Sequence, residues 1–592
     1  MVSSDRLPGT LARRKGGAGA FAQVVTGSAP HSSEPRACNE RAAPRGAHRL
    51  YFCHSLKRAV SSGCLPACLP ACLPACLPGC ERAGPGRAPG TPRAPRGGRR
   101  GRGEAGPGGG RPRGGGGLSS RLRLPGGGGG RPAVIAVGAA ALGPAAAAVM
   151  WRAAAAASAP LRALCRAPPP PPAPRRRAVS VAVTPAAGLA DERVDTRVAG
   201  LAPGQPVTLR AVVADERGCL FQSCAHYRAD GRGQLHLGTD ASHGGDYTGV
   251  EPMGLFWSLA PAGMERPYQR LVPRSTGTPM KVEMLVHQGH SQPGAIHGPV
   301  MAKAEVERWF TAPGVRRIRL KEGGVRGSLF LPPGDGPFPG VIDMYGDEGG
   351  LIEFRSSLLA THGFAALSLP YFDFEDLPKV MKEFNLEYFE EAARFLQRHP
   401  KVKGPGVGVI GTGKGAELAL SMITFLPEVV AAVCISGCSS NTVADLHYGE
   451  MTLPGLRFDM NKVSVSDAGV FDTFEALDDP TNPANSPCAI PIEKAEGHFL
   501  LVVGEDDRMW KSSLYAQLAI GRLRQHGKEN FALLSYPGAG HRIDPPSTPF
   551  CQVAVDRVLG VPVLGGGESK AHAHAQEHSW GKIQEFLHLH LG

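Results

Sequence analysis

The chain lacks any run of about 20 apolar residues free of proline, glycine and charge, and this argues against a membrane-spanning helix. It also has few aromatic residues, 6% of 592, and none lies within the Arg/Gly-rich run at 97–103. Such a run offers no rings on which nucleic-acid bases could stack. Residues 191–592 contain 37 Lys and Arg against 47 Asp and Glu, a net charge of −10 that does not attract nucleic acid. We therefore expect neither a membrane span nor a nucleic-acid partner.

Acidic residues are scarce in the first part of the chain, where residues 1–149 contain 22 Lys and Arg against 5 Asp and Glu. This segment is rich in Gly, Pro, Ala and Arg, and a Cys-Leu-Pro-Ala repeat runs from Cys64 to Cys80. The composition predicts a low-complexity, disordered leader. Zinc binding by the repeat, RNA association through 97–103, and a translated upstream region of the gene are the alternatives.

The six cysteines of 191–592 have no framework spacing, so reduced thiols are expected there.

Residues 150–177 begin with a second methionine, Met150, and contain Ala and Arg but no Asp or Glu. This composition is typical of a mitochondrial presequence, with an ordinary Ala/Pro linker as the alternative. Translation from Met150 predicts a protein of the mitochondrial matrix, and translation from Met1 a cytoplasmic one. The C-terminal tripeptide His-Leu-Gly is not a peroxisomal signal.

The hydrophobic pattern changes near residue 311. Between 178 and 310, short alternating runs such as 207–213 and 280–286 are separated by Gly, Pro and Asp turns, which predicts an antiparallel β-sandwich. Between 311 and 592, buried-type strands alternate with amphipathic helices, which predicts a parallel α/β sheet. The expected organisation is thus a leader, a presequence-like segment and two domains.

The sequence Gly-Thr-Gly-Lys-Gly at 411–415 follows the apolar run 407–410 and precedes a helical pattern at 416–422. An α/β-hydrolase has Gly-x-Ser-x-Gly at such a strand-to-helix turn, and Gly413 takes the place of the nucleophilic serine. A P-loop match through Gly413 and Lys414 lacks the Ser or Thr that would hold magnesium at 415. A dinucleotide fingerprint at 406–411 falls inside the strand instead of after it.

Two further residues complete a hydrolase order. Asp507 follows the apolar run 499–503, and His541 follows the strand pattern 531–536. Because the carboxyl ends of parallel strands meet at one edge of a sheet, we expect Asp507 to orient His541 there as acid and base of a triad. The histidines at 572, 574 and 578 lie in a polar stretch and are expected to be solvated.

Longer stretches support a family resemblance, among them 200–210, 251–255, 386–392 and 403–408. On these residues the chain over about 178–592 resembles the acyl-CoA thioesterase and bile acid-CoA:amino acid N-acyltransferase family. The resemblance implies a β-sandwich followed by an α/β-hydrolase domain. It also implies cleavage of fatty acyl-CoA, with no metal or redox cofactor. CoA enters the reaction only as part of the substrate. Family members use Ser or Cys at the position of Gly413, and their acid and base fall on Asp507 and His541.

Acyl transfer also needs N–H donors for the oxyanion. The N–H of Lys414 and the loop 346–350, with Gly349 and Gly350, are the candidates. Asp347 and Glu348 depart from the glycine-rich family pattern in this loop.

A glycine at 413 leaves several functions open. The chain is an acyl-CoA hydrolase with an unrecognised nucleophile or a misread serine codon, an inactive acyl-CoA-binding protein, or a member of the amino acid acyltransferase branch. The hydroxyl of Thr412 is expected to point away from His541, and Cys434 and Cys438 are expected to be core thiols. Water activated directly by His541 is the remaining, slow route.

Overall fold

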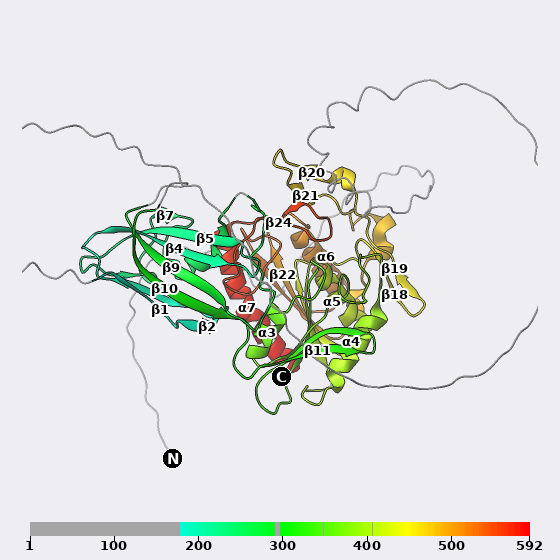
Figure 1. Cartoon of the computed structure of the whole chain (residues 1–592). Helices are drawn as coiled ribbons and strands as arrows, with labels where there is room; N and C mark the ends of the chain where they lie inside the picture. Colours follow the sequence, from blue (N-terminus) through cyan, green and yellow to red (C-terminus); the bar gives the residue numbers. More distant parts are fainter. Residues whose placement is uncertain (1–177, 264, 291–296, 347, 405) are drawn as a thin grey trace, which may run out of the picture. The chain divides into compact units, whose positions relative to one another are not determined.

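The computed structural model of the chain describes residues 178–263, 265–290, 297–346, 348–404 and 406–592 (Figure 1). The predicted leader and presequence-like segment, 1–149 and 150–177, lie outside the described residues. Within the described residues, no helix combines the length and the apolar character needed to cross a membrane.

Two sheets form the first part of the described chain. The larger has the order β2-β10-β9-β4-β5-β7, with β8 beside β5, and the smaller has the order β1-β3-β6. Their bounds are β1 Ser180–Thr184, β2 Ala187–Leu189, β3 Asp195–Ala199, β4 Pro206–Ala214, β5 Leu220–Arg228, β6 Leu235–His236, β7 Gly244–Gly245, β8 Ala260–Pro261, β9 Met280–Gln288 and β10 Val300–Trp309. A short helix, α2, covers Gly254–Trp257. All pairings are antiparallel except β10 with β2.

The two sheets share one hydrophobic core, which makes this part a β-sandwich. Val198 of the smaller sheet clusters with Val207 and Leu209 of β4 and with Val282 and Val286 of β9. These side chains are almost completely buried and alternate along their strands with more exposed residues. The period of two predicted from the sequence therefore follows from burying one face of each strand.

The second part is built on an eight-stranded sheet of order β11-β12-β14-β13-β16-β17-β22-β23. The first three strands are antiparallel neighbours, and all pairings from β14 to β23 are parallel. The bounds are β11 Arg316–Glu322, β12 Val325–Leu331, β13 Gly340–Met344, β14 Ala365–Ser368, β16 Val407–Thr412, β17 Val429–Ile435, β22 His498–Gly504 and β23 Phe531–Tyr536.

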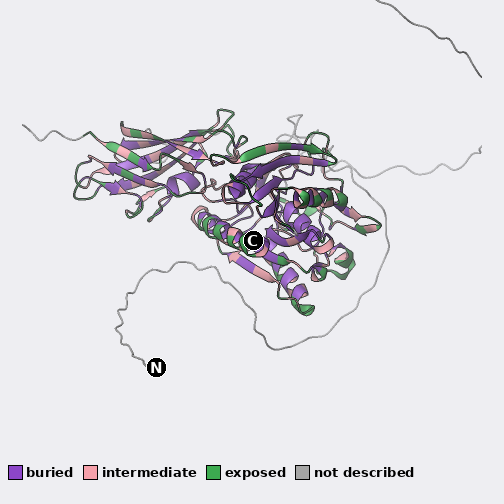
Figure 2. Ribbon diagram, turned by 90° about the horizontal axis from the view of Figure 1, so that it is seen from below, coloured by how far each residue is buried: buried purple, intermediate pink, exposed green. Residues whose placement is uncertain are grey.

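Helices cover both faces of this sheet (Figure 1). The strands from β12 to β22 are almost entirely buried, whereas the edge strand β11 is mostly exposed (Figure 2). Helices α4 (Leu386–Arg398), α5 (Lys414–Phe425) and α6 (Ser512–Gln525) contribute to the core on one face. Helices α3 (Phe354–Thr361) and α7 (Ser569–Leu591) contribute to the core on the other. This is the doubly covered parallel arrangement of an α/β-hydrolase, and the predicted fold class is confirmed.

Smaller elements complete the fold. Three strands, β15 Glu383–Asn385, β18 Asp445–Tyr448 and β19 Met451–Leu453, form one sheet. Four strands, β20 Ser464–Val465, β21 Phe471–Asp472, β24 Val553–Val555 and β25 Pro562–Leu564, form another. The 3₁₀ helices are η1 Met460–Lys462, η2 Pro483–Cys488 and η3 Ile492–Lys494.

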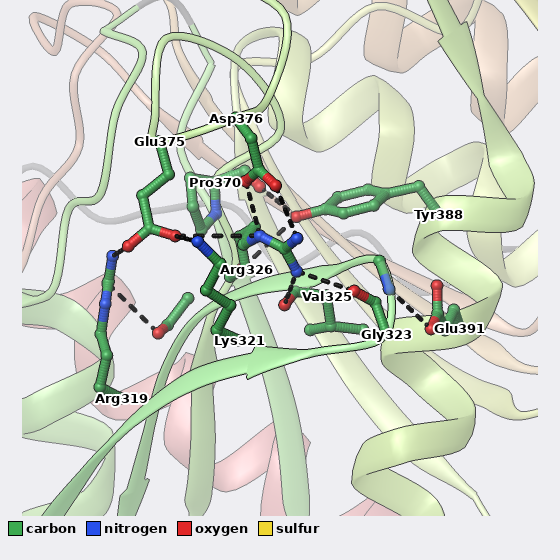
Figure 3. A network of polar contacts seen from close by, with 12 residues as sticks. Arg319, Lys321, Gly323, Val325, Arg326, Pro370, Glu375, Asp376, Tyr388 and Glu391 are labelled. Atoms are coloured by element: carbon green, nitrogen blue, oxygen red, sulfur yellow. Dashed lines mark hydrogen bonds and ion pairs between the residues drawn. The ribbon is translucent and has the colours of Figure 1, made fainter. Parts of the chain in front are cut away.

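A group of ion pairs fastens the β11–β12 hairpin to the turn after β14 (Figure 3). The Arg326 guanidinium donates to both carboxylate oxygens of Asp376, at 2.6 and 2.7 Å. Arg319 donates to Glu375 at 2.7 Å, and Glu375 adopts a positive φ of 44° that non-glycine residues rarely take. The paired Arg–carboxylate geometry offsets this strain by holding the turn in place.

The strand β16 approaches helix α5 so closely that Gly411 has no room for a side chain. A Cβ on Gly411 would lie 2.1 Å from Gly415 O and 2.5 Å from Ala416 N. We expect Gly411→Ala to lower the free energy of unfolding by about 1–3 kcal/mol or more, because backbone atoms must shift. Denaturant unfolding measures this. The control is Gly521→Ala in α6, where a Cβ would meet nothing within 4 Å and helix propensity predicts a gain of about 0.5–1 kcal/mol. Equal effects of both substitutions would contradict the packing explanation.

Candidate active site

The turn between β16 and α5 has the backbone of a nucleophile elbow without its side chain. Gly413 has φ 57° and ψ −122° and sits between the last residue of the strand and the first residue of the helix. Its N–H donates to Ile435 O at 2.9 Å, and its carbonyl accepts from Ala416 at 3.0 Å. Glycine adopts a positive φ without the steric cost that a side chain adds. The predicted sharp turn is therefore present, and the nucleophile position holds only a backbone.

Asp507 and His541 are brought together from the ends of β22 and β23. Asp507 Oδ2 lies 2.8 Å from His541 Nδ1, and each side chain is only 2% exposed. The other oxygen, Oδ1, accepts from the backbone N–H groups of Met509 at 2.9 Å and Trp510 at 3.0 Å. These two bonds fix the carboxylate, which in turn fixes the imidazole ring. Nε2 of His541 is then the nitrogen that would exchange a proton with a reacting group.

A small pocket adjoins His541 and joins the three parts of the site. Its lining residues are Arg270, Tyr345, Gly346, Glu348, Thr412, His541, Arg542 and Asp544. Gly346, two residues after β13, lies against the elbow, because a Cβ there would be 2.5 Å from Thr412 O and 2.7 Å from Lys414 N. The end of β13, the elbow and the histidine loop thus meet as the sheet topology predicted.

The candidate oxyanion donors differ in their surroundings. Lys414 is the first residue of α5, a helix position whose N–H has no partner within the helix. The N–H of Gly350, in contrast, donates to Phe372 O at 2.9 Å. Gly350 is therefore not available as a donor in this structure, and its assignment from the sequence is corrected. Gly349 packs against the Phe372 ring, where a Cβ would come within 2.7 Å, and its role remains a prediction.

A fully buried arginine lies beneath the elbow. Arg355 donates to Asp343 Oδ1 at 2.6 and 2.8 Å and to the Thr412 hydroxyl at 2.8 Å. Ser356 donates to the second oxygen of Asp343 at 2.7 Å. Burial alone would lower the pKa of Arg355, but the Asp343 carboxylate raises it above its usual value. The Thr412 hydroxyl therefore accepts a hydrogen bond from a buried cation, which disfavours it as a substitute nucleophile.

A second buried cation follows the elbow, and the sequence did not predict its side-chain role. Lys414 Nζ donates to Glu417, to Asn441 Oδ1 at 2.9 Å and to Thr442 O at 2.8 Å. Glu417 also accepts from the N–H and hydroxyl of Thr442, at 2.9 and 2.7 Å. Burial raises the pKa of Glu417, and Lys414 opposes the shift. The i, i+3 spacing of Lys414 and Glu417 on an otherwise apolar helix was the available signal.

An arginine from the β-sandwich part of the chain, Arg270, also lines the pocket. Arg270 donates to Asp544 Oδ2 at 2.7 Å and forms an ion pair with Glu348. The Tyr345 hydroxyl donates to the other oxygen of Asp544 at 3.2 Å. Burial lowers the pKa of Arg270 and raises that of Tyr345. Sequence reasoning missed this group, since its members are up to 274 residues apart.

The remaining candidates divide into a confirmed and a corrected prediction. Cys434 and Cys438 are buried, and burial raises the pKa of both thiols, as core cysteines should show. His572 is not solvated: it is buried in α7, its Nε2 donates to Arg542 O at 2.8 Å, and burial lowers its pKa to about 4. His578 bonds the Tyr536 hydroxyl at 2.8 Å, and His574 lies 3.1 Å from Glu251. Because α7 is rich in polar residues, its sequence did not reveal which of its side chains face the core.

Comparison with known proteins places this site in a family. The family description Acyl-CoA thioester hydrolase/BAAT N-terminal region matches residues 191–322, and BAAT/Acyl-CoA thioester hydrolase C terminal matches residues 384–592. The chain belongs to this family of acyl-CoA thioester hydrolases and acyltransferases. The second match contains the elbow, Asp507 and His541, so the departure at Gly413 lies inside the shared region.

Curated relatives include both activities named in the family. Human mitochondrial acyl-coenzyme A thioesterase 2 is 48% identical over 68% of this chain and 82% of the relative. A mouse peroxisomal succinyl-coenzyme A thioesterase is 46% identical over 68% of this chain and 94% of the relative. Rat acyl-coenzyme A amino acid N-acyltransferase 2 is 47% identical over 70% of this chain and 98% of the relative. Similarity alone therefore does not separate the two activities.

The contribution of the buried Lys414–Glu417 ion pair to stability can be tested by substitution. We expect Lys414→Met to lower the free energy of unfolding by about 3–5 kcal/mol, because it leaves the Glu417 carboxylate buried beside an apolar side chain. Chemical denaturation monitored by circular dichroism measures the loss. The double variant Lys414→Met/Glu417→Gln removes the charge but keeps an acceptor for Thr442, and it should recover more than half of that loss. A double variant as unstable as the single one would show that packing, not the unpaired charge, dominates.

Proposed function

We propose that this protein binds fatty acyl-CoA thioesters at the Asp507–His541 site and hydrolyses them slowly to fatty acid and CoA, within fatty acid and acyl-CoA metabolism. The observation that carries the proposal is the 2.8 Å Asp507–His541 pair beside an elbow whose backbone is intact and whose side chain is missing. Family membership supplies the substrate class. The thioester itself brings the CoA group, and the proposal needs no metal or redox cofactor.

The residues present support direct attack by water. His541 Nε2 would take a proton from a water molecule as its oxygen attacks the thioester carbonyl, while Asp507 holds the ring and stabilises the imidazolium. The N–H of Lys414 would receive the negative charge that develops on the carbonyl oxygen. CoA then leaves as the thiolate and takes the proton from His541. Removing a triad nucleophile lowers turnover by on the order of 10⁶ in a serine protease, so this route is slow.

A second function, acyl-CoA binding without turnover, is favoured by the same glycine. Both functions predict that acyl-CoA binds, and they differ in whether CoA is released. Comparison of release rates with and without enzyme therefore separates them.

Restoring the missing nucleophile tests the assignment of the site. We expect Gly413→Ser in the full chain to raise hydrolysis of a long-chain acyl-CoA by at least about 100-fold, with a limit on the order of 10⁶, because a hydroxyl then stands on the elbow. Thiol release followed with a chromogenic disulfide measures this.

Two controls accompany the serine variant. Gly413→Ala imposes the same positive φ on a side chain but supplies no hydroxyl, and it should not raise turnover. His541→Asn in the serine background should remove the gain, since no base remains to take the hydroxyl proton. A serine variant no faster than the alanine variant would refute the site assignment.

We further propose that the protein works in the mitochondrial matrix when translation starts at Met150. The acid-free segment 150–177 supports this location, and the relatives themselves include a mitochondrial and a peroxisomal protein. Intact-mass measurement of the native protein should give a chain that begins after residue 150, shortened further by presequence removal. Detection of peptides from 1–149 in the native protein would contradict the Met150 start.

A further inference from the structure

The elbow supplies one candidate donor for the oxyanion of the thioester, the backbone N–H of Lys414 at the start of α5. The N–H of Gly350 is already bound to Phe372 O at 2.9 Å. Sites for acyl transfer combine several donors, and a side-chain hydroxyl can take the place of a backbone N–H. A second donor must lie at the same edge of the sheet, close to both the elbow and His541.

Tyr345 meets this requirement by its position in the chain. It directly follows β13 and lines one small pocket together with Thr412 and His541. The next residue, Gly346, lies so close to the elbow that a Cβ there would be 2.7 Å from Lys414 N. The end of β13 therefore places Tyr345 one residue away from the contact with the elbow donor.

The Tyr345 ring is held by packing on its apolar surface. The Arg355 guanidinium carbon lies 4.1 Å from the ring centroid, and the Phe354 ring packs at 5.5 Å between centroids. The backbone carbonyl of Tyr345 accepts from the Tyr371 hydroxyl at 2.7 Å, and this bond fixes the turn that carries the ring. A donor held in place in advance needs little reorganisation when charge develops on a substrate oxygen.

The partner that the Tyr345 hydroxyl has in this structure is one that it can leave. The hydroxyl donates to Asp544 Oδ1 at 3.2 Å, which is longer than an ordinary O–H···O bond. The other oxygen of Asp544 accepts from Arg270 at 2.7 Å, so Asp544 keeps a charged partner when Tyr345 turns away. Burial raises the pKa of Tyr345 well above its usual value, although the positive charge of Arg355 opposes the shift. The hydroxyl therefore carries its proton at neutral pH and can donate it in a hydrogen bond.

We propose that Tyr345 is a catalytic residue whose hydroxyl turns from Asp544 to the thioester oxygen and stabilises the oxyanion together with the N–H of Lys414. The inference rests on the proposed hydrolysis and adds a residue to it. Tyr345 keeps its proton throughout, so no bond to it forms or breaks. The same role serves attack by water in the native chain and attack by the hydroxyl introduced with Gly413→Ser.

The kinetic test uses the full chain with Gly413→Ser, with and without Tyr345→Phe, which keeps the ring and removes only the hydroxyl. We expect Tyr345→Phe to lower kcat for palmitoyl-CoA by about 10²- to 10³-fold, the loss found when one oxyanion donor is removed from a protease. KM and the affinity for a non-hydrolysable palmitoyl-CoA thioether should stay unchanged, since neither depends on the charge of the transition state. The matched control is Tyr388→Phe, whose hydroxyl donates to Pro370 O, and it should leave kcat unchanged.

A second measurement observes the oxyanion directly. The hydroxyl introduced by Gly413→Ser adds to a long-chain alkyl trifluoromethyl ketone, and fluorine NMR follows the ionisation of the resulting hemiketal as the pH is changed. Tyr345→Phe should raise the pKa of the hemiketal and weaken binding of the ketone by about 10²- to 10³-fold, because the anion then has one donor fewer. A residue that only supports the fold would not change this pKa.

The outcomes separate this inference from the proposed acyl-CoA site. An equal weakening of thioether and ketone binding by Tyr345→Phe, reproduced by Asp544→Asn, would show that the hydroxyl only orients Asp544. Equal kcat values and equal hemiketal pKa values with and without the hydroxyl would refute the role of Tyr345 and leave the acyl-CoA site standing. Failure of the Gly413→Ser chain to bind the thioether would refute both.

Discussion

Two buried cations hold the turn at residue 413, and the geometry of the site depends on them. Arg355 binds Thr412 from beneath the strand, and Lys414 ties the start of α5 to residues 441 and 442. Each cation is removed from water at a cost that several hydrogen bonds must offset. Each has a carboxylate partner, Asp343 or Glu417, together with neutral acceptors. The elbow is thus held by polar contacts on both sides of residue 413, and none of them involves a side chain at that position.

This arrangement explains how a hydrolase site can persist without a nucleophile. The positive φ at 413 is a strain for serine or cysteine and costs glycine nothing. A glycine at 413 therefore removes the backbone strain of the turn and, with it, the reactive side-chain atom. Strained active-site residues commonly lower stability in exchange for activity. Asp507 also keeps its place independently, because the backbone N–H groups of Met509 and Trp510 hold its carboxylate.

The sequence predicted those features that local pattern controls. The strand 531–536 was expected from an apolar run and has the same bounds in the structure, and the order elbow, Asp507, His541 follows from parallel strand ends meeting at one edge. Features that depend on long-range packing escaped prediction. Nothing local marks Arg270 as a partner of Asp544, or the inward face of α7 that buries His572. The N–H of Gly350 was misassigned because its acceptor, Phe372 O, lies on a separate turn.

Helix α7 has a consequence for the order in which the molecule can fold. Its residue Ala573 belongs to the core of the β-sandwich, and Leu587 and Leu591 lie against Gly408 on β16, where a Cβ would be 3.1 and 2.8 Å from them. The strand that leads into the elbow therefore keeps one apolar face uncovered until α7 has left the ribosome. Synthesis proceeds from the N-terminus, so the β-sandwich strands emerge early while this face must wait for nearly the whole described chain. An apolar surface left uncovered during that interval is the kind that makes a partly folded chain prone to aggregation.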